Sequence, residues 1–430
     1  MENYQNQPRQ GFFQSTTAKM IMVGLLTLIL LIPLAFVQDL ISERSQRQKE
    51  VITQTTSKWG ESVYFYGPIL KIPYKNPITN QVENAFFFPE KLSNNSDTEI
   101  KAPLQRSIYK SNVFTTKMHF EGFYSNPKFY KNGIPTENIY WDKATILIRT
   151  TNLKSVNDEV KIKFGTTNYT FEPKFTEANN DSIQTLETGY FNYKTINNNP
   201  FQLDITYNGS KRISIVPIGK ATAVKMTSNW ASPSFNGSFI PTDKKITNKG
   251  FDASWKISHF NRPFAQENFQ SLPELSKYAL TVDFITPVDE YQQNERASKY
   301  GFLVIGLTFL IFFLIQSISK ISIHIFQYVM IGIALIMFYT LLISITEHSS
   351  FSFAYSIAGT SVVALISLYS ISILKDKKFP TFIAISLSVL YTFIYVIIQL
   401  EDYALLVGSI GLLLILASVM YFSRKIEWNK

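Results

Sequence analysis

The chain has 430 residues, a formal net charge of +9 and no cysteine. The absence of cysteine excludes disulfide bridges, thiolate metal sites and cysteine nucleophiles. The hydrophobic fraction of 46% averages two unlike regions, because polar and strand-forming residues dominate up to residue 300 and Ile, Leu, Phe and Val dominate after it. The length and this break predict more than one domain.

The first long apolar run covers residues 20–37 and follows a polar segment at residues 1–19. It is just long enough to cross about 30 Å of hydrocarbon as a helix. A cleaved signal peptide is the alternative, but its apolar region has only about 7–15 residues and ends at small residues. Because Ala35-Phe36-Val37 lacks small residues at both cleavage positions, we predict a retained membrane helix.

The C-terminal part of the chain, residues 300–422, contains five further apolar runs. They cover residues 300–318, 326–345, 353–374, 381–398 and 403–422. None has an ionisable side chain in its middle, so a bundle of five membrane helices is predicted, followed by a tail at residues 423–430. Six spans in total place both termini on the same side of the membrane.

The charges in the loops predict which side that is. Basic residues precede the first run and follow the second, fourth and sixth: Arg9, Lys19, Lys320, Lys375, Lys377, Lys378, Arg424, Lys425 and Lys430. The alternate loops carry acidic residues and a histidine: Glu347, His348, Glu401 and Asp402. The positive-inside rule therefore places both termini in the cytoplasm, and the positive charge gives no indication of a nucleic-acid partner.

Three basic residues shortly after the first run oppose this orientation: Arg44, Arg47 and Lys49. Long translocated domains are largely exempt from the charge rule, so the loops of the C-terminal bundle decide the orientation. We therefore expect residues 38–299 to form a domain on the export side of the membrane.

The exported domain begins with helix-forming residues, which we expect to continue the first span into a stalk that ends at Gly60. Strand patterns then recur, at residues 62–66, 69–74, 84–88, 144–150, 160–164, 169–175, 201–207 and 211–216. Asn208-Gly209-Ser210 separates the last two, which predicts a hairpin. A large, mostly antiparallel β domain, sandwich-like, is the expected fold.

Motifs for catalysis are missing from the sequence. The four histidines have no metal-binding spacing, and the chain has neither a G-x-S-x-G elbow nor a glycine-rich phosphate loop. We therefore expect no enzyme activity, no cofactor and no metal site, although carboxylates could still converge in the folded domain. The serines of the C-terminal runs favour helix packing over a substrate path.

Four stretches carry a resemblance to a known family. They are VKMTSNWASPSFNGSFIP from Val224, GFDASWKISHFNRPF from Gly250, TPVDEYQQNERASKYGFLVIGLTFLIFFLIQ from Thr286 and QYVMIGIALIMFYTLLISITEHSSFSFA from Gln327. The chain resembles the CreD family, inner-membrane proteins also known for colicin tolerance, and the order of anchor, periplasmic domain and helix bundle fits that family. The resemblance implies a role in envelope integrity and in the response to cell-wall stress, with changed sensitivity to colicins and β-lactams. It implies no reaction, ligand or catalytic residue.

Two groups of residues are candidates for binding or coupling. Trp230, Phe235 and Phe239 surround Gly and Pro residues, a composition common in binding surfaces and equally in aromatic plugs at strand ends. Arg296 lies in the segment that leads into the second span, where it could form a salt bridge at the membrane surface. Glu347 and His348 could meet this segment, and His348 would then be able to sense pH. A solvated helix start and a solvated histidine are the alternatives.

The predicted function is non-catalytic binding of an unknown envelope component or membrane protein, with the helices embedded in the lipid bilayer of the bacterial inner membrane. Two alternatives stay open. The first is a membrane-bound enzyme or sensor that acts on cell-wall or lipid material, which would need an aromatic cleft with convergent carboxylates. The second is a transporter component, which would need a polar cavity between the last five helices.

Overall fold

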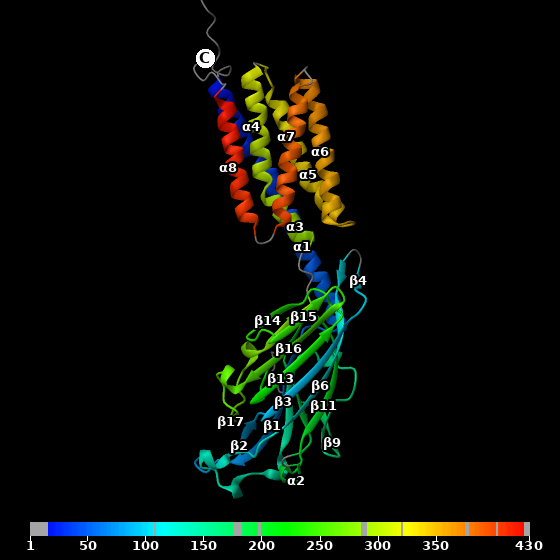
Figure 1. Ribbon diagram of the computed structural model, residues 1–430, viewed down its shortest axis with the longest axis vertical. Coiled ribbons are helices and arrows are strands. Elements are labelled where there is room, and N and C mark those ends of the chain that lie inside the picture. Colours follow the sequence, from blue (N-terminus) through cyan, green and yellow to red (C-terminus); the bar gives the residue numbers. More distant parts are fainter. Residues whose placement is uncertain are drawn as a thin grey trace, which may run out of the picture. The chain divides into compact units, whose positions relative to one another are not determined.

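The chain in this computed structural model forms two units (Figure 1). The helical unit contains residues 1–49 and 288–430, and the β unit contains residues 50–287. The structure describes residues 16–106, 109–174, 183–196, 199–284, 290–319, 321–374, 378–400 and 403–424. Several charged residues used to predict orientation lie outside the described residues: Arg9, Lys320, Lys375, Lys377, Glu401, Asp402, Lys425 and Lys430.

Six helices of the described chain are long and apolar enough to span a membrane, one near the N-terminus and five near the C-terminus, as predicted. They are α1 (Thr16–Trp59), α4 (Gly301–Ser319), α5 (Ile325–Thr346), α6 (Phe351–Leu374), α7 (Lys378–Gln399) and α8 (Ala404–Ser423). Helix α1 continues beyond its apolar part and ends just before Gly60, as expected for the stalk. A β-carbon on Gly60 would lie 2.2 Å from the carbonyl oxygen of Asn208, so no larger residue fits there.

A short helix, α3 (Glu290–Lys299), precedes α4 and packs against the bundle. Its two faces differ, because Asn294 and Ala297 are fully buried whereas Arg296 and Lys299 are exposed. The side chain of Gln38 in α1 donates a hydrogen bond of 2.9 Å to the carbonyl oxygen of Ser298. Helix α3 is therefore a packed element of the helical unit and more than a solvated start of α4.

In the β unit, β4 (Leu104–Arg106) and β5 (Tyr109–Ser111) form a separate two-stranded sheet, and the other described strands form two larger sheets. The first contains β1 (Val63–Lys75), β2 (Val82–Phe87), β7 (Thr145–Thr150), β10 (Gln184–Thr188), β12 (Arg212–Ile215), β14 (Ser234–Gly237), β17 (Glu267–Phe269) and β18 (Leu280–Asp283). The second contains β3 (Lys91–Ile100), β6 (Val113–Phe123), β8 (Lys161–Phe164), β11 (Phe201–Ser210), β13 (Ala221–Ser228), β15 (Asp243–Thr247) and β16 (Gly250–Ser258).

One strand joins the two sheets at one side of the β unit. Strand β9 (Thr167–Lys174) pairs with β10 of the first sheet and with β8 of the second. Most pairings are antiparallel, but β1 with β12 and β3 with β13 are parallel, so the domain is a mixed β structure. The opposite side ends in the edge strands β14 and β15.

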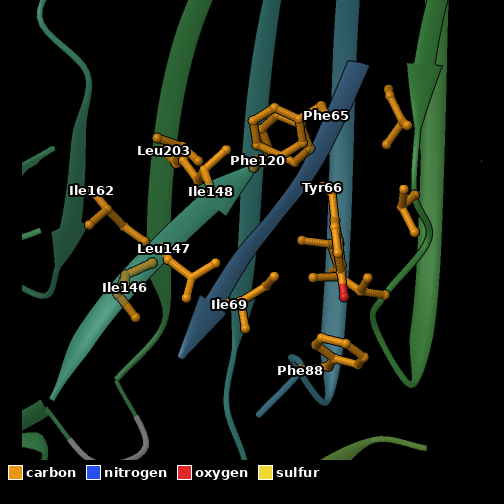
Figure 2. Close-up of a cluster of buried hydrophobic side chains, with 14 of the residues drawn as sticks. Phe65, Tyr66, Ile69, Phe88, Phe120, Ile146, Leu147, Ile148, Ile162 and Leu203 are labelled. Atoms are coloured by element: carbon orange, nitrogen blue, oxygen red, sulfur yellow. The ribbon is translucent and has the colours of Figure 1, made fainter. Parts of the chain in front are cut away.

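The core of the β unit lies between the two sheets. The rings of Phe65 in β1 and Phe120 in β6 stack at 4.2 Å, with Ile148 and Leu203 beside them (Figure 2). All four side chains are fully buried. Burial of each such side chain contributes about 1.5–3 kcal/mol, so this contact between sheets is a main source of stability for the unit.

The predicted hairpin of residues 201–216 is wrong. Strand β11 continues through Ser210 and pairs with β6 and β8, whereas β12 pairs with β1 and β18 in the other sheet. The chain changes sheets at Lys211, whose φ is 66°. Gly209 is required for a close approach, because a β-carbon there would lie 2.5 Å from the ring of Phe114.

Replacement of Gly209 tests this explanation. We expect Gly209→Ala to destabilise the β unit by about 1–3 kcal/mol, because the new methyl group overpacks the core. The matched control is Gly189→Ala, since a β-carbon at Gly189 meets no atom within 4 Å and its φ is not positive. The control is expected to be neutral or slightly stabilising.

Denaturation of the full-length protein in detergent, followed by tryptophan fluorescence, measures both variants. Four of the five tryptophans lie in the β unit: Trp59, Trp141, Trp230 and Trp255. Equal unfolding free energies for the two variants would contradict the role of Gly209.

Candidate functional site

The aromatic candidates of the β unit pack against its core. Trp230, Phe235 and Phe239 are all half-buried on the core cluster. The ring of Phe235 lies 5.9 Å from that of Trp255, and the indole nitrogen of Trp255 donates a hydrogen bond of 3.2 Å to the carbonyl oxygen of Phe239. These contacts favour the alternative of an aromatic plug beside the edge strands, and a binding role for the three residues stays a prediction.

The candidates of the helical unit separate into two places. Glu347 follows α5 and lies 3.8 Å from the guanidinium of Arg44 in α1, so its described ion-pair partner is not Arg296. His348 is exposed beside it. Arg296 faces outward from α3, where it lines a cavity together with Lys299.

One histidine of the β unit sits between two carboxylates that sequence reasoning did not bring together. His119 on β6 contacts Asp204 of β11 through Nδ1 at 2.6 Å and Glu121 through Nε2 at 3.0 Å. Hydrogen bonds to Glu121 and Asp204 raise the pKa of His119. All three side chains stand on the exposed face of the sheet, so the arrangement ties two strands together and forms no enclosed catalytic cleft.

A second cluster surrounds the carboxylate of Glu187, which is nearly buried on β10. It accepts hydrogen bonds from Lys71 at 2.5 Å, Lys174 at 2.6 Å and Thr145 at 2.7 Å. Burial opposes ionisation, but the hydrogen bonds from Lys174, Lys71 and Thr145 outweigh it and lower the pKa of Glu187. Within the described residues, no three histidines or carboxylates are grouped so that they could hold a metal ion.

The helical unit has a groove between α4, α7 and α8. Its main lobe has a volume of about 780 Å³. The lining residues are almost all apolar: Leu307, Leu310, Ile311, Leu314, Ile315, Ile318, Lys378, Phe379, Phe382, Ile385, Ser386, Val389, Leu390, Phe393, Gly411, Leu414, Ile415, Ser418, Val419 and Phe422. This volume is within the range of about 300–1,000 Å³ that is usual for ligand sites.

A second, separate cavity of about 350 Å³ lies between the same helices at α3 and is called the second lobe. It is lined by Arg296, Lys299, Tyr300, Phe302, Leu303, Phe393, Ile397, Gly408 and Leu412. Phe393 lines both lobes, which are therefore neighbours. The two lobes together are called the α4–α7–α8 groove below. Basic residues stand at both ends of it, Lys378 at one and Arg296 with Lys299 at the other.

The groove is present because α8 makes few close contacts with the other helices. None of the residues of α8 is buried. The ring of Phe393 in α7 occupies the space above Gly411, where a β-carbon would lie 2.1 Å from the ring. Because Gly411 has no side chain, α8 lies close to α7 at this position. The space between α8 and α4 stays open. The groove could not be predicted from the sequence, because its walls come from helices that meet only in the folded chain.

Comparisons with known proteins agree with the membrane architecture. A family model described as inner membrane protein CreD matches residues 15–429. The inner membrane protein CreD of Escherichia coli K12 is 28% identical over 420 residues, which cover 93% of this chain and 91% of that protein.

Two solved structures show weak likeness. An M1 zinc metallopeptidase of Deinococcus radiodurans has a TM-score of 0.21 and 10% identity, covering 46% of this chain and 42% of that one. A putative nutrient binding protein of Legionella pneumophila has a TM-score of 0.26 and 11% identity, covering 57% of this chain and 80% of that one. Scores this low carry no argument about fold or activity.

The Glu187 cluster gives a prediction about stability and pH. Glu187→Gln leaves the ammonium of Lys71, which is only 15% exposed, without a counter-charge. We expect a loss of about 3 kcal/mol at neutral pH, since removal of one partner of a buried ion pair is costly. Because the pKa of Glu187 is lowered in the folded state, its contribution is present at neutral pH and is lost as the pH falls through that pKa.

Chemical denaturation at several pH values measures this difference. Lys174→Gln is the control, because the side chain of Lys174 is 55% exposed and its removal is expected to cost less than about 1 kcal/mol. A Glu187→Gln effect that stays constant down to acid pH would contradict the assignment.

Proposed function

Because the chain belongs to the CreD family of inner membrane proteins, we propose that it maintains the integrity of the bacterial envelope without catalysis, by binding an envelope component through its β unit. The observation that carries this proposal is a set of exposed apolar side chains on a rigid end of that unit. The helical unit acts as the platform in the bilayer.

The exposed side chains belong to the turn between β1 and β2 and to the segment beside it. Ile78 is 90% exposed, Val82 is 64% exposed and Tyr130 is 73% exposed. Large apolar side chains at such exposure are typical of surfaces that bind other molecules when they stand close together. These three residues are called the hairpin tip below.

An aromatic cluster holds the hairpin tip in place. Phe129, next to Tyr130, is buried among four rings, with centroid distances of 5.2–5.9 Å. The rings are those of Tyr74, Phe87, Trp141 and Phe269. Tyr74 and Phe87 belong to β1 and β2, so the segment of Tyr130 is fixed to the strands that carry Ile78 and Val82. A rigid apolar surface loses little entropy on binding.

The proposed orientation places the β unit in the periplasm and both termini in the cytoplasm. Gln38 of α1 reaches Ser298, and Arg44 pairs with Glu347, so the start of the stalk, α3 and the end of α5 share one end of the helical unit. Arg44 opposes the positive-inside rule, but its charge is offset by Glu347. The other end of the helical unit carries Lys378 and Arg424.

Neither alternative function gains a specific observation. The cluster around His119 lies on an open sheet face, whereas an enzyme of cell-wall material would enclose its substrate. Between its basic ends, the lining of the main lobe of the α4–α7–α8 groove is apolar apart from Ser386 and Ser418, whereas a transporter would require polar or ionisable groups near the middle of the bilayer.

Accessibility of single cysteines tests the orientation. The natural chain has no cysteine, so Ile78→Cys, Ser350→Cys and Arg424→Cys each provide one thiol. We expect a membrane-impermeant maleimide to label the first two in spheroplasts and to label Arg424→Cys only after the membrane is permeabilised. The opposite pattern would place the β unit in the cytoplasm and exclude a periplasmic ligand.

Complementation of a deletion strain tests the binding surface. Ile78→Ser combined with Tyr130→Ser is expected to fail to restore the barrier of the envelope to a β-lactam, because the apolar contact is removed. The matched control combines Ile240→Ser with Phe260→Ser, which removes one aliphatic and one aromatic side chain of similar exposure elsewhere on the unit.

Drug uptake is measured at equal protein levels, established by immunoblot. Full restoration by the hairpin-tip variant would exclude this surface, and an unchanged barrier in the deletion strain would exclude the envelope role itself.

A further inference from the structure

The α4–α7–α8 groove has no part in binding through the β unit, and its chemistry points to a ligand of its own. Two kinds of surface meet in it. The helices contribute a nearly continuous apolar wall, and α3 contributes two exposed cations, Arg296 and Lys299, at one end. The described lining residues of both lobes include no carboxylate.

We propose that the groove holds one anionic phospholipid, with its phosphate at Arg296 and Lys299 and an acyl chain along α4, α7 and α8. Basic groups between or beside membrane helices attract anionic headgroups. The apolar wall matches a hydrocarbon chain, and Phe393 lines both the lobe at the cations and the lobe along the helices, so the two are neighbours.

Charge complementarity selects this occupant over a helix of another protein. A purely apolar helix has nothing to offer Arg296 and Lys299, whereas a phosphate satisfies both. A membrane helix of 20 residues is about 30 Å long and about 10 Å across, so it fills a volume of roughly 2,400 Å³. The main lobe of about 780 Å³ could therefore receive only part of such a helix.

The bound lipid has a structural consequence for α8. Helices associate in a bilayer through close packing, since lipid and leucine are equally apolar. Helix α8 makes such a contact with α7 at Gly411 but buries none of its residues. A lipid chain in the groove fills the space between α8 and α4 and so continues the packing that the protein side chains leave incomplete.

The proposal is tested on the full-length protein, delipidated in mild detergent and titrated with phosphatidylglycerol or with phosphatidylcholine of the same chain length. Native mass spectrometry counts the bound lipids. The natural protein is expected to retain one phosphatidylglycerol in preference to phosphatidylcholine. Arg296→Gln with Lys299→Gln is expected to reduce this preference about 30-fold, since each basic residue contributes about fivefold.

Two controls separate the site from general effects. Lys49→Gln with Lys58→Gln removes the same charge from exposed positions of α1 outside the groove, and it should bind lipid like the natural protein. Ser386→Trp fills the main lobe and should weaken the binding of both lipids. Ser388→Trp adds the same side chain on the same helix at an exposed position that does not line the groove, and it should have no effect.

Several results would overturn the proposal. Equal binding of the two lipids, or unchanged preference in the Arg296→Gln, Lys299→Gln variant, would show that the cations serve contacts within the protein. Displacement of the bound lipid by glycerol 3-phosphate alone would show a site for the headgroup only. Unchanged lipid binding with altered self-association in Ser386→Trp would assign the groove to a second copy of the chain. None of these outcomes depends on the envelope role or on the orientation.

Discussion

A backbone amide without a hydrogen-bond partner costs several kcal/mol in hydrocarbon, and this constraint divides the chain into its two units. Helices satisfy their own backbone, so residues after 300 can lie in lipid. The β unit cannot, because its edge strands β14 and β15 have unpaired backbone groups. Strand β15 is exposed throughout and carries Lys244 and Lys245, which keep such an edge in water. The long helix α1 is the form in which the chain can continue from lipid into water without losing backbone hydrogen bonds.

The elements that the sequence predicts best are those whose structure depends on local composition. The apolar runs and the stalk depend on local composition, and the helices follow them closely. Strand β3 was missed because its inward face is polar: Asn94, Ser96 and Thr98 are buried. These groups satisfy one another, since Ser96 contacts Asn94 at 2.7 Å and Thr98 contacts Thr116 of β6 at 2.9 Å. Alternation of apolar and polar residues cannot reveal a strand whose buried side chains are polar and find hydrogen-bond partners within the fold.

Long-range contacts are what the sequence could not supply. Gly209 looks like a turn residue in the sequence, but glycine is needed there because the ring of Phe114, on another strand, leaves no space for a β-carbon. The partner of Glu347 in the folded chain is Arg44 of α1, which lies far from it in the sequence. The lining of the groove comes from α3, α4, α7 and α8, so only the folded helices define it. The composition of the chain predicts that each wall of the groove is apolar. It does not predict that a cavity lies between these walls.

One of the stretches that carry the family resemblance, GFDASWKISHFNRPF, contributes buried side chains that hold parts of the β unit together. Arg262 is 4% exposed and donates hydrogen bonds to the carbonyl oxygens of Ile218, Gly219 and Phe264 at 3.1–3.3 Å. Burial lowers the pKa of its guanidinium to about 10, which still leaves it protonated at neutral pH. The buried guanidinium holds the segment between β12 and β13 through the carbonyl oxygens of Ile218 and Gly219. The indole nitrogen of Trp255 likewise donates a hydrogen bond to the carbonyl oxygen of Phe239. The buried side chains of this stretch, Trp255 and Arg262, therefore hold the β unit together, whereas the two surfaces proposed for binding, the hairpin tip and the ends of the groove, consist of exposed side chains.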